Sequence, residues 1–439
     1  MGDIDNDGDL DIFITNEYST NRLFLNNGVG IFKEITKEAQ LETIEGGNSA
    51  TFGDIDNDGD IDLYVTNWSS QNILYQNQFV ETGKVVFKNF TQKSQTGGKA
   101  YTKSNAVVFS DLDNDGDLDL FVTNRKTSNR IYINNGKGVF TDNTEVLISL
   151  DTASSYGAVI ADFDGDSCKD IYVSNVGENI FYKNSDGKFI EQTSKYGGSV
   201  KGYSTGSALA DFDNDGDLDI YIANYVGASS ALLRNKKKDK QHITLTIEGI
   251  QNTRNAIGAK IYVYNHSSKL LWFDEIRAGS GYVSVNDFKK VIPIQNQDSV
   301  YVKVIFPNGI IKSIKSVHTG SVLHIYDTEG FQKTLLEFKH SLKKWLFDPH
   351  YLFELIKWIF VILLISITGF VLQKKHFWNP LFPIIGGLLF LTFYLIQYLN
   401  FEYSPFLYAT VCIRIVADFG SRIFQFTTNI DAGYNAHTY

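Results

Sequence analysis

DLDNDGDLD, residues 111–119, is one of five versions of the same nine-residue stretch in this chain. In chain order the versions, named loop 1 to loop 5 below, are DIDNDGDLD at 3–11, DIDNDGDID at 54–62, DLDNDGDLD at 111–119, DFDGDSCKD at 162–170 and DFDNDGDLD at 211–219. Their starts lie 49 to 57 residues apart. Self-similarity at a period of this size is typical of repeat architectures, so it is the first guide to the fold.

All five loops place candidate metal ligands at the same positions. In loop 3, carboxylates stand at positions 1, 3, 5 and 9, Gly116 allows a tight turn, and Asp117 can turn its backbone carbonyl inward. Hard oxygen ligands in this number suit Ca²⁺, at roughly 2.3–2.6 Å each. The candidate calcium ligands are Asp3, Asp5, Asp7, Asp9, Asp11, Asp54, Asp56, Asp58, Asp60, Asp62, Asp111, Asp113, Asp115, Asp117, Asp119, Asp162, Asp164, Asp166, Cys168 (through its backbone), Asp170, Asp211, Asp213, Asp215, Asp217 and Asp219.

Electrostatics supports a bound cation. Two carboxylates ~4 Å apart repel by about 4 kcal/mol at an effective dielectric constant near 20, so a loop with four or five of them should open or take up protons without one. A solvated acidic turn is the alternative, but it does not explain five copies. An EF-hand is excluded, because position 12 holds Ile or Val where that motif needs a bidentate Glu.

The residues around each loop predict strands. Small-residue segments such as AVVFS (106–110) enter the loops, and β-branched and aromatic segments such as LFVTN (120–124) leave them. Two more short strands follow, and Asn27-Gly28, Asn135-Gly136 and Asp186-Gly187 are hairpin turns between them. Four short antiparallel strands per repeat predict a blade of a β-propeller. A one-sided solenoid is the alternative architecture.

The motif and the strand that follows it resemble the FG-GAP or VCBS repeat of integrin-type β-propellers, over residues 1–235. That resemblance implies a calcium-binding propeller, with seven blades as a rule, outside the cell. Only four complete units and one partial unit are expected here, so we predict an open arc. Loop 4 departs from the pattern, with Ser167 in place of the turn glycine, and we expect the glycine's role to pass to Gly165 and the site to bind calcium more weakly.

A second β-domain is predicted at residues 241–330. NAIGAK (255–260), RAGSGY (277–282) and FPNG (306–309) resemble the ASPIC/UnbV domain that follows such propellers in the cartilage acidic protein family. The family implies a small β-domain without a known catalytic constellation. On a plainer interpretation its glycines are turn residues.

Residues 351–417 predict two or three transmembrane helices, and residues 418–439 form an unassigned tail. Phe377–Phe401 carries no charge over a length that gives about 37 Å of helix. Trp358–Leu372 is a second apolar segment, and Tyr403–Ala417 is a weaker third that Arg414 interrupts. Met1 leads directly into loop 1 without a preceding strand or a signal peptide, and we interpret this as a missing beginning.

The charge, the cysteine count and the motifs of the chain limit the classes of function that the sequence supports. The net charge of −10 comes largely from the loops, and five Ca²⁺ ions would cancel it. The sequence has no basic face with interleaved aromatic residues, so it does not predict a nucleic-acid partner. Its two cysteines, Cys168 and Cys412, are too few for a disulfide framework. No nucleophile, Walker or zinc-protease motif indicates an enzyme.

The sequence thus predicts an all-β partial propeller plus a small β-domain, anchored by membrane helices, with the propeller extracellular or periplasmic. The expected role is non-catalytic adhesion or recognition of a protein or glycan. The extracellular sensor of a signalling receptor and a surface glycan-active enzyme are the alternatives.

Overall fold

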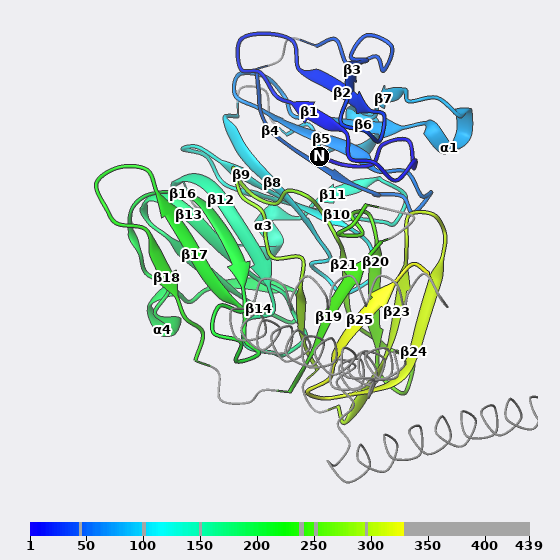
Figure 1. Ribbon diagram of the computed structural model, residues 1–439. Coiled ribbons are helices and arrows are strands. Elements are labelled where there is room, and N and C mark those ends of the chain that lie inside the picture. Colours follow the sequence, from blue (N-terminus) through cyan, green and yellow to red (C-terminus); the bar gives the residue numbers. More distant parts are fainter. Residues whose placement is uncertain are drawn as a thin grey trace, which may run out of the picture. The chain divides into compact units, whose positions relative to one another are not determined.

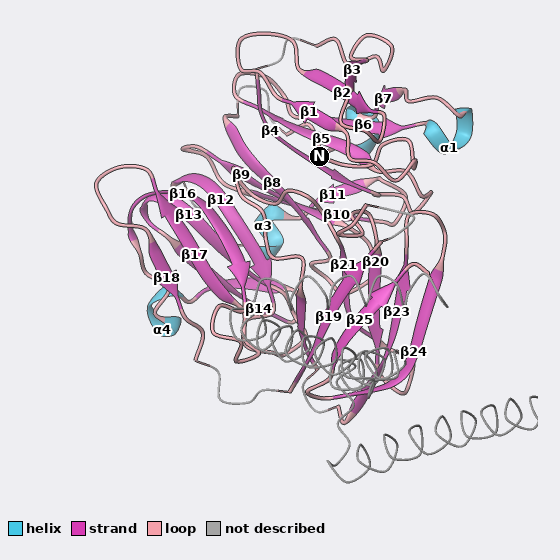
Figure 2. Ribbon diagram, in the orientation of Figure 1, coloured by secondary structure: helices cyan, strands magenta, loops and turns pink. Residues whose placement is uncertain are grey.

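Strands dominate the protein in the computed structural model, which describes residues 1–43, 46–98, 102–148, 152–236, 241–249, 253–294 and 297–328 (Figure 2). The helices among these residues are single turns: α1 Phe79–Thr82, α2 Thr91–Ser94, α3 Thr144–Leu147 and α4 Thr193–Tyr196. The all-β prediction is therefore confirmed for the described part of the chain.

The helices predicted at 351–417 and the tail at 418–439 lie outside the described residues. Among the helices that are described, none has the length and apolar character needed to cross a membrane.

Loops 2 to 5 each connect two paired antiparallel strands, and loop 1 leads into β1 (Figure 1). The expected leading strands and the strands after the loops form as predicted. In chain order the strands of the repeats are β1 Ile12–Ile14, β2 Arg22–Asn26, β3 Phe32–Glu34, β4 Gly47–Gly53, β5 Asp62–Asn67, β6 Ile73–Asn77, β7 Phe87–Asn89, β8 Ser104–Ser110, β9 Asp119–Asn124, β10 Arg130–Asn134, β11 Phe140–Asp142, β12 Ser154–Ala161, β13 Asp170–Glu178, β14 Ile180–Ser185, β15 Lys188–Glu191, β16 Lys201–Ala210, β17 Asp219–Asn224 and β18 Ala231–Leu233.

Of the four complete units expected, three have all four strands in the described residues: β4–β7, β8–β11 and β12–β15. The first sheet, β1–β3, has only an isolated bridge between Gly2 and Asp11 where a leading strand would pair. The described part of the fifth repeat contributes β16, β17 and β18. These three strands join the fourth sheet, because β13 and β16 are long enough to pair with each other at Val176 and Tyr203. No strand of β1–β3 pairs with β16–β18 in the described residues.

The core of the repeats lies between consecutive sheets. The leading strands β4, β8, β12 and β16 contact one another in this order, and one apolar cluster fills each space between neighbouring sheets. Both faces of the inner strands are covered, so β8 and β9 are buried at every residue. The outer strands are short and mostly exposed, as in β3 and β7. This stacking makes neighbouring repeats depend on one another for burial.

The predicted second β-domain is formed by two sheets. Their orders are β22-β19-β25 and β21-β20-β23-β24, and β19 pairs with β25 in parallel. Alternating residues such as Leu245 and Val302 fill the space between the sheets. The strands are β19 His242–Glu248, β20 Lys260–Tyr264, β21 Leu270–Glu275, β22 Lys290–Pro293, β23 Ser299–Ile305, β24 Ile311–His318 and β25 Val322–Tyr326.

In the second, third and fourth sheets, a buried asparagine near the end of the third strand connects two repeats. The side-chain amide of Asn134 donates to the carbonyl oxygen of Leu118 in its own loop, at 3.1 Å, and to that of Ile55 in loop 2, at 2.8 Å. Asn77 bonds loop 1 in the same way through Ile4, and Asn184 bonds loop 3 through Leu112. These bonds hold each loop to the sheet that follows it.

We therefore expect Asn134→Ala to lower the free energy of unfolding by about 1–3 kcal/mol, because it leaves two buried carbonyls without their donor. Thermal or denaturant unfolding of the purified protein measures this loss. Asn26→Ala is the matched control. Asn26 occupies the same place in the first sheet, but among the described residues its side-chain amide donates only to Leu10 of its own loop, at 3.2 Å, and it is partly exposed. An equal loss in both variants would contradict the cross-repeat role.

Candidate metal centres

The backbone of each loop turns through two residues with positive φ. In loops 1, 2, 3 and 5 these are the asparagine at position 4, with φ between 54° and 63°, and the glycine at position 6, with φ between 91° and 97°. In loop 4 Gly165 takes position 4 and Ser167 keeps positive φ at position 6, both at 72°. The expectation that the glycine's role passes to Gly165 is therefore wrong: both turns persist, and Ser167 carries a conformation that disfavours non-glycine residues.

The turn points its amides at the aspartate at position 1. Asp111 accepts from the backbone N–H groups of Asp115 and Gly116, both at 3.2 Å. Loops 1, 4 and 5 show the same pair of bonds, and in loop 2 Asp54 accepts from Gly59 at 3.1 Å. The first carboxylate is therefore fixed by its own loop.

The aspartate at position 9 holds the loop to the sheet. One Asp119 oxygen accepts from the N–H of Leu112 and the other from the N–H of Asn134, both at 2.8 Å. Equivalent pairs of bonds occur at Asp11, Asp62, Asp170 and Asp219. Asp119 is fully buried, so a single carboxylate satisfies amides from two parts of the repeat.

In loops 1 to 4, three of the candidate aspartates lie close together, at positions 1, 3 and 9 in loops 1 and 4 and at positions 1, 3 and 5 in loops 2 and 3. In each of the following groups every residue offers one oxygen, and these oxygens lie within 4.8 Å of one another: Asp3, Asp5 and Asp11; Asp54, Asp56 and Asp58; Asp111, Asp113 and Asp115; Asp162, Asp164 and Asp170. In loops 1 and 2 four buried carboxylate oxygens lack a hydrogen-bond partner among the described residues: Asp5 Oδ1, Asp54 Oδ1, Asp56 Oδ1 and Asp58 Oδ2. Buried and unpartnered oxygens of this kind are suited to a hard divalent cation.

Position 7 behaves differently. Asp117 accepts from the side chain of Asn57 in the preceding loop at 2.9 Å, and Asp60 accepts from Asn6 at 3.3 Å. These two side chains connect neighbouring loops. At the same position in loop 4, burial raises the pKa of the Cys168 thiol to about 11, which disfavours the thiolate that binds metals.

Loop 2 gains one carboxylate that the sequence analysis missed. Glu81 of α1 lies with Asp58 and Asp60, with one oxygen from each within 4.8 Å of the others. α1 lies in the extra residues between β6 and β7, and these belong to the longest of the intervals between loops. The long interval between loops 2 and 3 was the signal in the sequence that could have indicated an additional element here.

The charged form of these carboxylates is costly without a cation. Burial, and then repulsion from Asp113 and its neighbours, raises the pKa of Asp119 to about 8. Burial likewise raises the pKa of Asp111 to about 7 and that of Asp3 to about 7. Such shifts mean that the folded, metal-free loops favour protonated aspartates near neutral pH.

Cationic side chains reach three loops, and the sequence analysis did not include them. Lys260 of β20 lies 2.7 Å from Asp54 in loop 2. Lys183 of β14 contacts Asp164 in loop 4, and Arg234 contacts Asp213 in loop 5. These basic residues belong to strands or segments outside the loops, so the loop motif alone does not predict their contacts with the aspartates.

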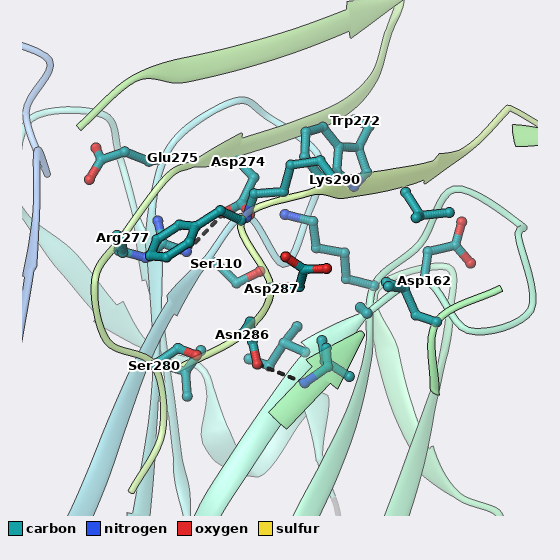
Figure 3. A pocket seen from close by; sticks show the side chains of 18 of the residues that line it. Ser110, Asp162, Trp272, Asp274, Glu275, Arg277, Ser280, Asn286, Asp287 and Lys290 are labelled. Carbon is teal, nitrogen blue, oxygen red and sulfur yellow. Dashed lines mark hydrogen bonds and ion pairs between the residues drawn. The ribbon is translucent and has the colours of Figure 1, made fainter. Parts of the chain in front are cut away.

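A second charged cluster lies beside the repeats around a small cavity of about 70 Å³ (Figure 3). Asp274 pairs with Arg277 at 2.8 Å and with Lys290 at 2.9 Å. Burial alone would raise the pKa of Asp274, but these two cations hold it below its usual range. Arg277 also donates to the carbonyl of Phe109 in β8 at 2.8 Å, and Lys169 of loop 4 donates to the carbonyl of Phe273 at 2.5 Å. The cluster therefore connects the small β-domain to the repeats.

Comparisons with known proteins agree with the sequence motifs. Residues 3–65, 54–122, 111–173 and 162–222 match the FG-GAP-like repeat, and residues 249–332 match the domain described as ASPIC and UnbV. Both resemblances drawn from the sequence are thereby confirmed. Each FG-GAP match spans two consecutive loops.

Relatives in sequence are similar over part of their length. The chain is 30% identical over 186 residues to cartilage acidic protein 1 of Xenopus tropicalis, covering 40% of this chain and 28% of that protein. It is 28% identical over 178 residues to the Homo sapiens protein of the same name, covering 38% and 26%. The aligned part is thus little more than a quarter of these relatives.

Solved structures overlap loosely. An Agrocybe aegerita lectin is 16% identical, with 65% of this chain and 79% of that chain covered at a TM-score of 0.32. The rhamnogalacturonan lyase YesW is 14% identical, with 72% and 63% covered at 0.33. Overlaps at these scores carry no argument about ligand or activity.

We expect the thermal midpoint of the metal-free protein to fall as the pH rises from 5 to 8. Because the pKa of Asp119 is raised from 3.8 to about 8, the folded state keeps protons in this range that the unfolded chain has lost, so unfolding becomes easier as the pH rises. Asp274, whose pKa is lowered, acts in the opposite sense only below this range. Calorimetry in a chelating buffer measures the trend, and a midpoint that rises over the same range would contradict it. Saturating Ca²⁺ should remove the trend.

Proposed function

The chain belongs to the FG-GAP-like repeat family and carries an ASPIC and UnbV domain after the repeats, and from this premise we propose that it is a calcium-stabilised, non-catalytic recognition protein outside the cell. The observation that carries the calcium proposal is the set of buried, unpartnered carboxylate oxygens in loops 1 and 2. Removing such oxygens from water without a compensating charge is unfavourable, and a hard cation supplies that charge.

In loops 1, 2, 3 and 5 the aspartates at positions 1, 3, 5 and 9 would hold the ion, and Ca²⁺ would supply the charge that neutralises them. The protein's own residues prepare the site. Turn amides orient the first carboxylate, and the amides of Leu112 and Asn134 orient Asp119 at position 9. The carboxylates are thus positioned before an ion arrives, which reduces the conformational entropy lost on binding.

Aromatic side chains favour a recognition role at the end of the sheets opposite the loops. Trp68 follows β5 and lies under two cations, Lys103 at 5.2 Å and Arg125 at 5.1 Å from the ring centroid. Tyr18, after β1, and Tyr225, after β17, are 88% and 76% exposed. Exposed aromatic residues on loops carried by a rigid scaffold are typical of binding surfaces. A protein or a glycan is the partner class we propose.

Location outside the cell follows from the calcium proposal. Open, oxygen-rich sites in extracellular modules bind Ca²⁺ at roughly 10⁻⁴–10⁻³ M, a concentration that extracellular fluid supplies. We propose that the apolar segments within 351–417 anchor the chain in a membrane, with residues 1–350 on the outer side. Large domains translocate largely regardless of their charge, so the lysines before the first segment do not oppose this orientation.

Calcium should raise the thermal midpoint of the purified protein, because an ion that binds only the folded state adds about 2.7 kcal/mol at a hundredfold excess over its Kd. Differential scanning calorimetry with Ca²⁺ or with EDTA measures the difference. Asp113→Asn should lower the midpoint in Ca²⁺ and change it much less in EDTA. Asp298→Asn, at an exposed position away from the loops, is the control. An equal thermal midpoint in Ca²⁺ and in EDTA would rule out the proposal.

Orientation can be measured on intact cells with single cysteines and an impermeant thiol reagent. In a background that replaces Cys168 and Cys412, we expect Tyr18→Cys to be labelled, because this side chain is exposed, and Lys374→Cys to be protected until the cells are permeabilised. The reverse pattern would place the repeats in the cytosol.

A further inference from the structure

The five loops are not equivalent, and the difference lies one residue before the buried asparagine of the third strand. In every repeat the N–H of this asparagine donates to the aspartate at position 9, at 2.8 or 2.9 Å. This common bond aligns the third strands residue by residue. The residues before the asparagine, in loop order, are Leu25, Gln76, Ile133, Lys183 and Arg234.

Where this side chain is polar, it contacts the aspartate at position 3 of its own loop. Gln76 donates to Asp56 at 2.5 Å, and Arg234 contacts Asp213. In loops 1 and 3 the position is apolar. No ammonium or guanidinium among the described residues lies within ion-pair distance of the loop 1 or loop 3 aspartates.

Loop 4 has the most complete internal contact. The Lys183 ammonium lies 2.7 Å from Asp164, 2.5 Å from Asp166 and 3.6 Å from Asp170, which are positions 3, 5 and 9. Its side chain is only 11% exposed. An ammonium has three donors, and this one has three carboxylates around it. One cationic group therefore stands among the same aspartates that would have to hold a metal ion.

The number of carboxylates in loop 4 also favours one internal cation over a divalent metal ion. Loop 4 has Cys168 at position 7, where the other four loops have aspartate, so it holds one carboxylate fewer. A loop that is neutralised by a single positive charge needs fewer carboxylates than one that binds a divalent ion. Calcium binding would also expel the Lys183 ammonium from its partners, and a buried charge left without them is strongly unfavourable.

We propose that Lys183 takes the place of the metal ion in loop 4, so that the fourth repeat folds without calcium while loops 1 and 3 depend on it. The inference rests on the proposed calcium function for the other loops. It replaces the expectation of a weak calcium site in loop 4 with that of a loop closed by its own lysine.

Calcium stoichiometry tests the proposal directly. Chelator-treated protein is titrated with Ca²⁺ by calorimetry, and bound metal is counted by elemental analysis after gel filtration. Lys183→Leu, which installs the residue found at this place in the first repeat, should bind one more Ca²⁺ per chain than the unmodified protein. Its thermal midpoint should fall in EDTA and recover in Ca²⁺. Adding Asp164→Asn to Lys183→Leu should remove the gained ion and so assign it to loop 4.

Two further variants keep the test decisive. Lys188→Leu on exposed β15 removes a lysine from the same sheet without touching the loop, and should leave the stoichiometry unchanged. Ile133→Lys, the reverse exchange in loop 3, should bind one Ca²⁺ fewer. If Lys183→Leu does not fold, Lys183→Gln, which copies the second repeat, replaces it.

An unchanged stoichiometry in folded Lys183→Leu and Lys183→Gln, or a loss of stability that calcium does not restore, would overturn the role of Lys183. A protein that binds no calcium until Lys183 is replaced would support that role and instead overturn the calcium proposal for the other loops.

Discussion

A carboxylate that accepts one backbone amide from its own loop and another at the third strand is the constraint on which the repeats depend. At Asp119 one oxygen closes the loop through Leu112 and the other fixes the third strand through Asn134. Because both bonds are buried, losing the carboxylate would leave two amides without partners. The same arrangement recurs at every position 9, so the loop cannot be detached from the sheet without breaking it. Acidic residues are thus structural in these repeats before any ion is considered.

This construction creates its own electrostatic problem. Carboxylates that are needed as acceptors are brought close to one another inside the protein, and burial raises the pKa of Asp111, Asp162 and Asp170 to about 7, about 7 and about 8. Protonation, a metal ion or an internal cation can each relieve the repulsion. Lys183 of β14, beside the aspartates of loop 4, and Lys260 of β20, beside Asp54 of loop 2, show that internal cations are among the means used. The repeats share one scaffold but differ in how they neutralise it.

The sequence was sufficient for the repeat and for the strands beside the loops, because these depend on local spacing. It was insufficient for Glu81, Lys183 and Lys260, because a side chain from another strand or helix meets a loop only through register and packing. Aligning the third strands on their asparagines would have set Lys183 beside Leu25 and Ile133. Ser167 shows a different limit: the fold retains a positive φ that its residue type disfavours.

The asparagine bonds between neighbouring repeats also define where the chain can be divided. In each of four repeats a side-chain amide donates to the loop of the preceding repeat, from Asn77, Asn134, Asn184 and Asn235. A cut between two sheets therefore leaves a carbonyl on one side and an amide on the other without a hydrogen-bond partner. A segment that runs from one loop to the third strand of the following repeat, such as Ile4 to Asn77, carries both partners of one bond inside itself. The transferable module of this protein therefore straddles two sheets. Because these bonds overlap along the chain, a joint between two sheets breaks one of them, whereas a joint between a loop and its own third strand in the second, third or fourth repeat breaks two.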